Sequence, residues 1–270
     1  MTTYLDRILA AHRETASLDG RSLEDLLDSA RSSEDPRGFI QALVGGTPDE
    51  IAVIAEVKRR SPSRGDLDTG LDPAVVAVQY ATGGAVCLSV LTDESFFGGS
   101  AGDLRTARLA VDLPVLRKDF TVDARDVCDA RIMGADAVLL IVAALDDQEM
   151  ADFYSLSTEL GMDTLVEVHD QSELERALAI GASLVGVNQR DLITFEVDPG
   201  RAGRMAPLMP EGVVRVAESG IKDKTAAMAL RQVGYHALLV GESLVTAGDR
   251  AAAVRALSQR VGGRAAGDPD

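Results

Sequence analysis

The chain has 270 residues, 46% of them hydrophobic, and its 43 acidic residues outnumber 27 basic ones to give a formal net charge of −16. A chain of this size can bury its own hydrophobic core without disulfides or metals. The negative charge repels phosphate backbones and anionic lipid, so we expect neither nucleic acid nor a membrane as a partner.

The first 50 residues predict helices rather than strands. Apolar residues recur at helical spacing in residues 5–12 and 23–27, and residues 36–44 predict a third, short helix. No change in composition separates this segment from the rest of the chain. We therefore expect residues 1–50 to form a helical extension packed on the domain that follows.

From residue 51 onward, short apolar runs rich in β-branched residues alternate with longer amphipathic stretches. This alternation is typical of parallel strands covered by crossover helices. The eight runs are residues 51–58, 85–92, 114–120, 137–143, 164–170, 184–190, 214–220 and 237–243. Eight such units predict an α/β fold, a closed (β/α)8 TIM barrel over residues 51–261, and the polar residues 262–270 are expected to fray.

Several helix boundaries can be read from single residues. Asp72-Pro73 and Asp198-Pro199 each match an N-cap followed by a proline at the first helical position. A glycine stands before every second predicted strand, where we expect a left-handed cap after the last helical turn. These glycines are Gly84, Gly134, Gly181 and Gly234. Their recurrence at every second unit favours a closed ring over an open sheet.

Polar residues stand at the carboxyl ends of five of the predicted strands. They are Glu56, Lys58, Lys118, Glu167, Asn188, Arg190, Glu218 and Ser219. In a barrel these ends meet at one rim, which is where the active sites of such barrels lie. A structural ion pair explains any one of them, but so many charges in one small mouth are costly without a ligand or mutual pairing. Their coincidence favours a catalytic site.

Glycines after the last two strands predict a phosphate site. The segments ESGI (218–221) and VGES (240–243) follow strands seven and eight, where barrels commonly bind phosphate through backbone N–H groups. Gly220 and Gly241 would allow a close approach, although both also suit ordinary turns. Ser61 and Arg64 add a hydroxyl and a positive charge to the same rim. The chain has neither a P-loop nor a dinucleotide-binding glycine pattern.

The cysteines and the amino terminus predict a cytoplasmic protein. Cys87 and Cys128 stand in apolar contexts that favour buried thiols over a disulfide. The amino terminus lacks the layout of a signal peptide. The longest uncharged apolar run, residues 137–145, falls far short of the roughly 20 residues that a membrane span requires.

The histidines and the loop aromatics have mainly structural interpretations. The three histidines share no ligand spacing, so no metal is expected. His169 falls on the face of Glu167 and is expected to be a hydrogen-bonded support, whereas His12 is expected to pack at the surface or against a helix. Phe96 and Phe97 suit an aromatic lid and simple loop anchoring about equally well.

Long motifs, in order through all eight predicted strands, resemble the indole-3-glycerol phosphate synthase family. They are IAEVKRRSPS (54–63), LSVLTD (88–93), PVLRKDF (114–120), GADAVLLI (134–141), LVEVHD (165–170), GVNQRDL (186–192), ESGI (218–221) and VGESL (240–244), with a fainter match in YLDRIL (4–9). The resemblance implies a carboxy-lyase of tryptophan biosynthesis that acts on a small anionic aromatic sugar phosphate. It implies no metal or redox cofactor, and we expect a monomer.

The same resemblance assigns roles to residues. Lys118 is the general acid at ring closure, Glu167 its acid–base partner in dehydration, and Lys58 holds the substrate carboxylate or protonates the departing hydroxyl. Residues implied to orient these groups are Glu56, Asn188 and Glu218. Residues implied to bind substrate are Ser61, Phe97, Phe120, Arg190, Ser219, Gly220, Gly241, Glu242 and Ser243, with the two phenylalanines at the aromatic ring.

The chain departs from the family pattern at a few positions. Gln189 stands where a second Asn is common, Arg125-Asp126 replaces a usual Tyr-Gln, and Gly65-Asp66 replaces a more apolar loop. None of these has an assigned proton-transfer role. Two alternatives stay open: a related sugar-phosphate isomerase barrel, which needs no second lysine for a carboxylate, and a non-catalytic phosphate-binding barrel.

Overall fold

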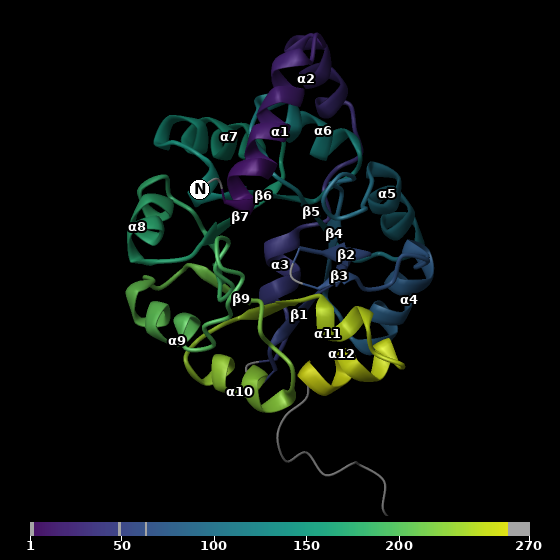
Figure 1. Ribbon diagram of the computed structural model, residues 1–270, viewed down its shortest axis with the longest axis vertical. Coiled ribbons are helices and arrows are strands. Elements are labelled where there is room, and N and C mark those ends of the chain that lie inside the picture. The colour runs from purple at the N-terminus through teal and green to yellow at the C-terminus, as the bar shows by residue number, and fades with distance from the viewer. Residues whose placement is uncertain (1–2, 48–49, 63, 259–270) are drawn as a thin grey trace, which may run out of the picture.

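The computed structural model describes residues 3–47, 50–62 and 64–258. Within them, eight parallel strands close into a barrel in the order β1-β10-β9-β8-β7-β6-β5-β4 (Figure 1). The strands are β1 (Ala52–Val57), β4 (Cys87–Leu91), β5 (Val115–Lys118), β6 (Ala137–Ile141), β7 (Asp163–Val168), β8 (Leu184–Asn188), β9 (Val214–Glu218) and β10 (Ala237–Val240). The predicted (β/α)8 barrel is confirmed, while the prediction for residues 262–270 lies outside the described part of the chain.

The strands are buried on both faces, which explains their continuous apolar runs. Every residue of β4, β6 and β8 is buried. Closure is made by β1, where Ala52 pairs with Ala237 of β10 and Ile54 pairs with Cys87 of β4. A short antiparallel hairpin of β2 (Arg60–Ser61) and β3 (Gly65–Asp66), which the sequence did not predict, follows β1.

Helices cover the outside of the barrel in the predicted alternation. They are α4 (Pro73–Gly83), α5 (Ala101–Ala110), α6 (Ala124–Ile132), α7 (Asp147–Glu159), α8 (Gln171–Ala179), α9 (Arg201–Met205) and α10 (Lys224–Gln232), with α11 (Glu242–Val245) and α12 (Arg250–Ser258) after the last strand. Among the described residues, no helix combines the length and apolar character needed to cross a membrane.

The predicted helix boundaries are confirmed with one exception. Asp72 caps α4 by accepting a hydrogen bond from the N–H of Ala74 (2.8 Å), and the four cap glycines all have left-handed φ angles between +80° and +94°. The Asp198-Pro199 prediction is wrong, because α9 begins only at Arg201. The N–H of Asp198 instead donates to the carbonyl oxygen of Gln189 (2.8 Å), which holds this segment against the end of β8.

Three helices precede the barrel: α1 (Tyr4–Leu18), α2 (Leu23–Arg31) and α3 (Phe39–Val44). In Figure 1, α1 lies over the barrel and α2 projects beyond it beside α6. The shortest, α3, packs on β1, β4 and β9 at the opposite end, where the N–H of Ile40 donates to Asp163 at the start of β7 (2.8 Å). It begins three residues later than predicted. The division into extension and barrel at residue 50 stays a prediction.

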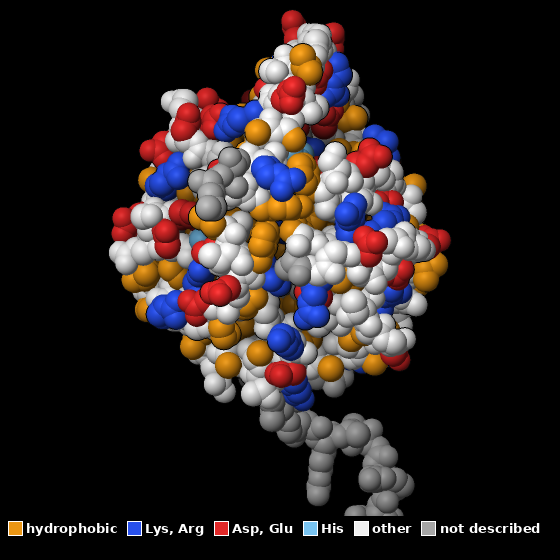
Figure 2. Space-filling view, viewed as in Figure 1, with side chains coloured by type: hydrophobic (Ala, Val, Ile, Leu, Met, Phe, Trp, Pro, Cys, Tyr) orange, Lys and Arg blue, Asp and Glu red, His pale blue; other side chains and the backbone are white. Residues whose placement is uncertain are grey.

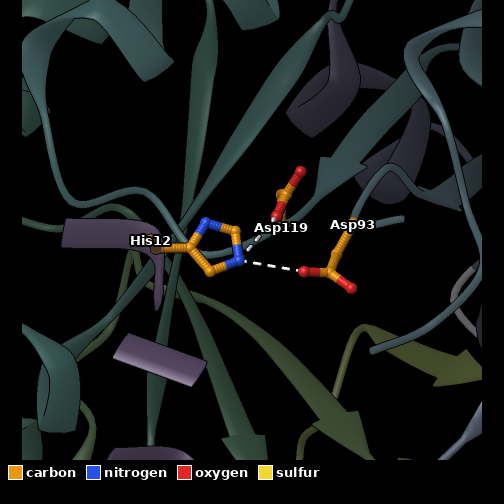
Figure 3. A group of neighbouring side chains, drawn as sticks. All are labelled: His12, Asp93 and Asp119. Atoms are coloured by element: carbon orange, nitrogen blue, oxygen red, sulfur yellow. Dashed lines mark hydrogen bonds and ion pairs between the residues drawn. The ribbon is translucent and has the colours of Figure 1, made fainter. Parts of the chain in front are cut away.

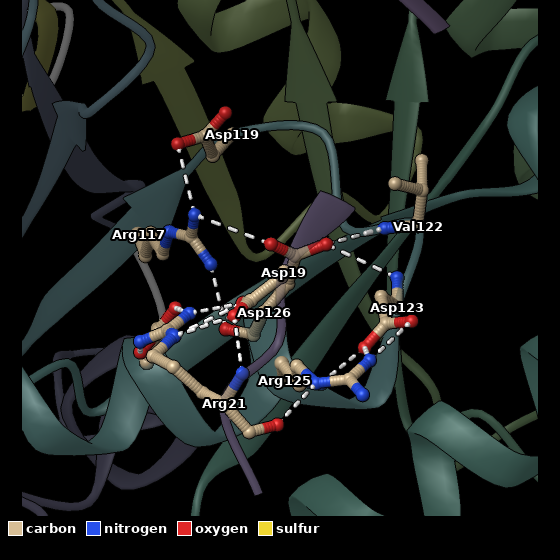
Figure 4. Close-up of polar contacts among 9 residues, drawn as sticks. Asp19, Arg21, Arg117, Asp119, Val122, Asp123, Arg125 and Asp126 are labelled. Atoms are coloured by element: carbon tan, nitrogen blue, oxygen red, sulfur yellow. Dashed lines mark hydrogen bonds and ion pairs between the residues drawn. The ribbon is translucent and has the colours of Figure 1, made fainter. Parts of the chain in front are cut away.

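The link between α1 and α2 is tied to α6 (Figure 4). Arg21 forms two hydrogen bonds of 2.8 Å with Asp129, and Nε of Arg125 donates to the carbonyl oxygen of Arg21 (3.1 Å). Asp126 accepts from the backbone N–H of Asp123 (3.0 Å) and completes a capping box at the start of α6. Of the two residues that depart from the common Tyr-Gln, Arg125 therefore joins the link to α6 and Asp126 caps α6 itself.

We expect the buried carboxylate of Asp136 to be a major stabilising group. It is completely buried and accepts hydrogen bonds from Arg108 and from the backbone N–H groups of Arg37 (2.7 Å) and Val115 (2.7 Å). Asp136→Ala leaves these donors unpaired, so the free energy of unfolding should fall by about 3–5 kcal/mol. Chemical denaturation measures this loss. Asp147→Ala, which removes an 82% exposed carboxylate from its pair with Arg176, is the control and should cost less than about 1 kcal/mol.

Candidate active site

A cavity of about 490 Å³ opens at the carboxyl ends of the barrel strands. On the face shown in Figure 2, hydrophobic side chains gather near the centre of the ring, with Lys and Arg side chains around them. Every residue that the sequence predicted for catalysis or substrate binding lines this cavity. They are Glu56, Lys58, Ser61, Phe97, Lys118, Phe120, Glu167, Asn188, Arg190, Glu218, Ser219, Gly220, Gly241, Glu242 and Ser243.

Lys118, the last residue of β5, lies among carboxylates. Its Nζ is 2.9 Å from Oε2 of Glu167 and 3.7 Å from Oε2 of Glu218. Burial alone would lower the pKa of Lys118, but the negative charges of Glu167, Glu218 and Glu56 raise it above its ordinary value. The side chain is therefore a protonated amine that faces the cavity, with a proton to donate.

Glu167, near the end of β7, is held as an anion. It is only 1% exposed, and burial by itself would raise its pKa, yet the charge of Lys118 and hydrogen bonds lower that pKa to about 2. One of these hydrogen bonds comes from Nδ2 of Asn188, which donates to Oε1 (3.1 Å). Lys118 and Asn188 thus engage different oxygens and fix the orientation of the carboxylate.

Glu218, at the end of β9, has a pKa shifted in the opposite direction to that of Glu167. Burial raises its pKa well above the ordinary value, and the nearby charge of Glu167 raises it further. Its Oε1 finds no hydrogen-bond partner among the residues that the structure describes. A Cβ atom on Gly186 would collide with this oxygen, so glycine at that position of β8 makes room for Glu218. Two neighbouring glutamates with pKa values pushed apart are a recurrent acid–base arrangement.

Lys58 and Glu56 form an ion pair at the end of β1. Their side chains fill the space beside Gly241, where a Cβ atom would collide with Oε1 of Glu56 and approach Nζ of Lys58 to 3.1 Å. A glycine is therefore needed at position 241 for the Lys58–Glu56 pair to reach the cavity, independently of any phosphate binding by its backbone.

Aromatic rings form one wall of the cavity, and helix α1 supports them. Phe97 and Phe120 line the cavity with their ring centroids 6.2 Å apart. The N–H of Phe97 donates to Asp93 (2.9 Å), whose other oxygen lies 2.9 Å from Nε2 of His12 (Figure 3). His12 also packs on Phe120, with ring centroids 5.4 Å apart. His12 was expected at the surface or against a helix, but it is half-buried and contacts the loops after β4 and β5 instead.

Phe96 and Phe97, for which the sequence suggested either a lid or a loop anchor, have different positions in the structure. Phe97 lines the cavity, whereas Phe96 packs edge-on against Tyr4 of α1 (5.9 Å between centroids). Tyr4 also contacts Phe195, a cavity residue in the loop after β8 (5.4 Å). Phe96 is therefore the anchor and Phe97 the ring that faces the cavity.

Among the described residues, His12, Asp93 and Asp119 form the one group whose ligand atoms are close enough to hold a metal ion, all within 4.8 Å (Figure 3). These atoms already have protein partners. Asp119 accepts hydrogen bonds from Thr92, Nη2 of Arg117 (3.1 Å) and the N–H of Phe120 (2.8 Å). The donor set is satisfied without an ion, which does not fit a metal centre.

The loops after β9 and β10 form the predicted phosphate region. Ser219 and Gly220 both have left-handed backbones, with φ +65° and +73°. Oγ of Ser243, in the short helix α11, donates to the carbonyl oxygen of Ile221 (3.2 Å) and ties the two loops together. The strained conformation of Ser219, which is not a glycine, indicates that the surrounding structure holds this turn in place.

Basic side chains surround this region. Nε of Arg64 lies 3.0 Å from Oε1 of Glu242, and Nη2 of Arg190 lies 3.9 Å from Oε2 of the same residue. Lys222 also lines the cavity and was missed in the sequence. Lys222 could have been predicted as a cavity residue, because it is a positive charge two residues after Gly220 in the predicted phosphate loop.

Solved structures of other barrels resemble the fold. The thiamine phosphate pyrophosphorylase from Pyrococcus furiosus matches with a TM-score of 0.59 and 16% identity, covering 78% of this chain and 95% of that chain. The N-acetylmannosamine-6-phosphate 2-epimerase from Clostridium perfringens matches with a TM-score of 0.59 and 11% identity, covering 78% and 93%. At these identities the likeness concerns the fold alone.

Sequence relatives are much closer. The family model described as indole-3-glycerol phosphate synthase matches residues 5–257. The indole-3-glycerol phosphate synthase of Nocardioides sp. is 49% identical over 252 residues, covering 93% of this chain and 94% of that protein. That of Leifsonia xyli subsp. xyli is 54% identical over 243 residues, covering 86% and 93%. A family model that spans almost the whole chain, together with relatives of this identity and coverage, shows that the chain belongs to the indole-3-glycerol phosphate synthase family.

Proposed function

We propose that this chain closes the indole ring of 1-(2-carboxyphenylamino)-1-deoxyribulose 5-phosphate and releases carbon dioxide and water to form indole-3-glycerol phosphate. The observation that carries the assignment to these residues is the position of the Lys118 ammonium, 2.9 Å from an ionised glutamate and inside a cavity with a second lysine. The chemistry needs an acid, a base and a cation for the substrate carboxylate, and this cavity contains all three.

Ring closure is assigned to Lys118. The aromatic carbon that bears the carboxylate attacks the ketone, and the carbonyl oxygen gains negative charge that a positioned acid must neutralise. The protonated amine of Lys118 donates the proton to that oxygen. Glu167 and Glu218 keep the amine charged and aimed into the cavity before the substrate arrives.

Dehydration is assigned to Glu167. After carbon dioxide has left, a proton and a hydroxide must be removed to complete the indole. Because its pKa lies at about 2, Glu167 begins as a base that can take the proton. Asn188 and Lys118 hold its two oxygens, and Glu218, 3.7 Å from the same lysine, orients the substrate hydroxyls.

Substrate binding is assigned to the remaining cavity residues. Lys58, held by Glu56, is placed to bind the substrate carboxylate, and Phe97 with Phe120 flanks the aromatic ring. The backbone of Ser219 and Gly220 and the start of α11 cradle the phosphate, where N–H groups at a helix start favour an anion. Binding residues that complete the rim are Ser61, Arg190, Gly241, Glu242 and Ser243.

The departure at Gln189 supports this phosphate site. The side chain is 2% exposed, and its Nε2 donates to the carbonyl oxygen of Ser219 (2.8 Å), which holds the left-handed turn. We expect Gln189→Met, which keeps the length but loses the donor, to weaken binding of inorganic phosphate roughly 2- to 10-fold, as one lost hydrogen bond predicts. Isothermal titration calorimetry measures this change. Thr164→Val removes a buried hydrogen bond to Ser157 outside the cavity (2.9 Å) and should leave phosphate binding unchanged; equal weakening in both variants would contradict the role of Gln189.

The proposed activity is tested by incubating the purified chain with the carboxyphenylamino-ribulose phosphate and following indole fluorescence. We expect indole-3-glycerol phosphate together with one carbon dioxide per molecule formed. Isomerisation of the sugar without carbon dioxide release would point instead to an isomerase. Binding of the substrate without any turnover would point to a non-catalytic phosphate-binding barrel.

The proposal includes a monomer in the cytoplasm. The roles proposed above are all assigned to residues of this chain, and a monomer is the simplest assembly that contains them. Cys87 and Cys128 are both buried free thiols, as predicted, and such thiols are usual in reducing compartments. Sedimentation of the purified chain at micromolar concentration tests the monomer.

A further inference from the structure

His169 lies behind the glutamate to which dehydration is assigned. It follows β7 directly, two residues after Glu167, and its side chain is 12% exposed. Its Nε2 is 3.5 Å from Oε1 of Glu167 and is a buried nitrogen for which the described residues supply no hydrogen-bond partner. His169 is not among the residues that line the cavity, so its ring approaches the carboxylate of Glu167 from the side away from the cavity.

The other side of the ring is fixed by the start of α8. Oε2 of Glu173 accepts a hydrogen bond from the backbone N–H of His169 (2.7 Å) and lies 3.0 Å from Nδ1. Glu173 is itself held, because its N–H donates to the N-cap Asp170 (2.9 Å). A carboxylate only accepts hydrogen bonds, so Nδ1 carries the proton in this contact. The ring therefore cannot turn away without losing Glu173.

We propose that His169 is a positioning residue for Glu167: its imidazolium donates from Nδ1 to Glu173 and directs Nε2–H at Oε1 of Glu167, which keeps that carboxylate ionised and turned toward Lys118. This role rests on the proposed function, because it acts through Glu167. The arrangement places a carboxylate on each side of the ring, 3.0 Å from one nitrogen and 3.5 Å from the other. A neutral ring would instead present a lone pair to an anion.

The charges around the ring favour its protonated form. Burial lowers the pKa of His169, but Glu173 and Glu167 raise it above 6.5 overall. Asp170 lies beside it at the start of α8. The positive charge of Arg201, in α9, lowers the pKa of His169. Nη1 of Arg201 is held by a hydrogen bond to the carbonyl oxygen of Asn188 (2.9 Å). As the pH rises through this pKa, Nε2 loses its proton. Glu167 then loses the favourable interaction of its Oε1 with the imidazolium.

The test is the pH dependence of kcat in the wild type and three variants. We expect the wild type to lose activity on an alkaline limb above pH 6.5, and His169→Gln, which does not titrate, to lack that limb. In the neutral range His169→Gln should lower kcat about 10- to 100-fold with KM within about twofold, the size of loss seen when the hydrogen-bonded partner of a metal-ligating side chain is removed. Glu173→Gln removes an anion from the imidazolium, lowers its pKa, and should move the limb to lower pH. Glu175→Gln, on the exposed side of α8, is the control and should match the wild type.

The possible outcomes separate this role from the proposed function. An active wild type whose alkaline limb is unchanged in His169→Gln and in Glu173→Gln overturns the role of His169 alone. Loss of kcat in His169→Gln with a parallel loss of stability and the same limb also overturns it, because that pattern is merely structural. A wild type that forms no indole-3-glycerol phosphate overturns the proposed function and this role with it.

Discussion

The Lys118→Met variant should lose about 10²- to 10⁴-fold in kcat while it binds inorganic phosphate within a few-fold of the wild type. Met keeps most of the length of the side chain but has no proton to donate, and acid catalysis typically contributes this much to the rate. Phosphate binding should survive because Lys118 contacts Glu167 and Glu218 rather than the loops after β9 and β10. Single-turnover fluorescence for the rate and calorimetry for phosphate measure both quantities.

The matched control for Lys118 is another lysine of the same cavity. Lys222 lies at the exposed rim beside the predicted phosphate loop. Lys222→Met should give the reverse pattern, with weaker phosphate binding and kcat close to the wild type. Near-normal turnover by Lys118→Met would remove Lys118 from the mechanism, and circular dichroism of each variant checks that the fold is retained.

The Glu167→Gln variant should stall after decarboxylation. The amide can still accept the hydrogen bond from Asn188, but it is not a base and directs an NH₂ group at the ammonium of Lys118. We therefore expect kcat to fall about 10²- to 10⁴-fold, with carbon dioxide released faster than indole-3-glycerol phosphate forms. Rapid-quench traces that follow both products measure the lag between the two steps.

The assignment of Glu167 to dehydration requires that the Glu167→Gln substitution slow that step more than ring closure or decarboxylation. Equal slowing of carbon dioxide release and indole formation in Glu167→Gln would contradict it and assign Glu167 to ring closure or to general support. Glu159→Gln, which changes an exposed glutamate at the end of α7, should leave both rates unchanged. The lowered pKa of Glu167 also predicts that this base is ionised throughout the neutral pH range in the free protein.

The barrel and its rim could be predicted from local features of the sequence. Parallel strands of a barrel are buried on both faces, so they appear as short apolar runs, and each of the eight predicted runs overlaps an observed strand. Because side chains alternate along a strand and the carboxyl ends converge, polar residues such as Lys118 and Glu167 could be assigned to one rim from the sequence alone.

Predictions failed where something outside the local sequence pattern decides what a residue does. Asp198-Pro199 matches a helix start locally, yet the bond from Asp198 to Gln189 delays α9. The contact of His12 with Asp93 joins residues 81 positions apart, and nothing in either local pattern indicates the other. Lys222 was overlooked because a lysine after a turn is usually an exposed, solvated charge.

The sequence by itself determined the order of the elements, the rim that bears the polar residues and the family. Only the tertiary structure decided which charges meet. The pKa values of Glu167 and Glu218 move in opposite directions although both are glutamates near strand ends. The physical reason is distance: both carboxylates are buried, but Nζ of Lys118 lies 2.9 Å from Glu167 and 3.7 Å from Glu218, and residue types and spacing do not specify such separations.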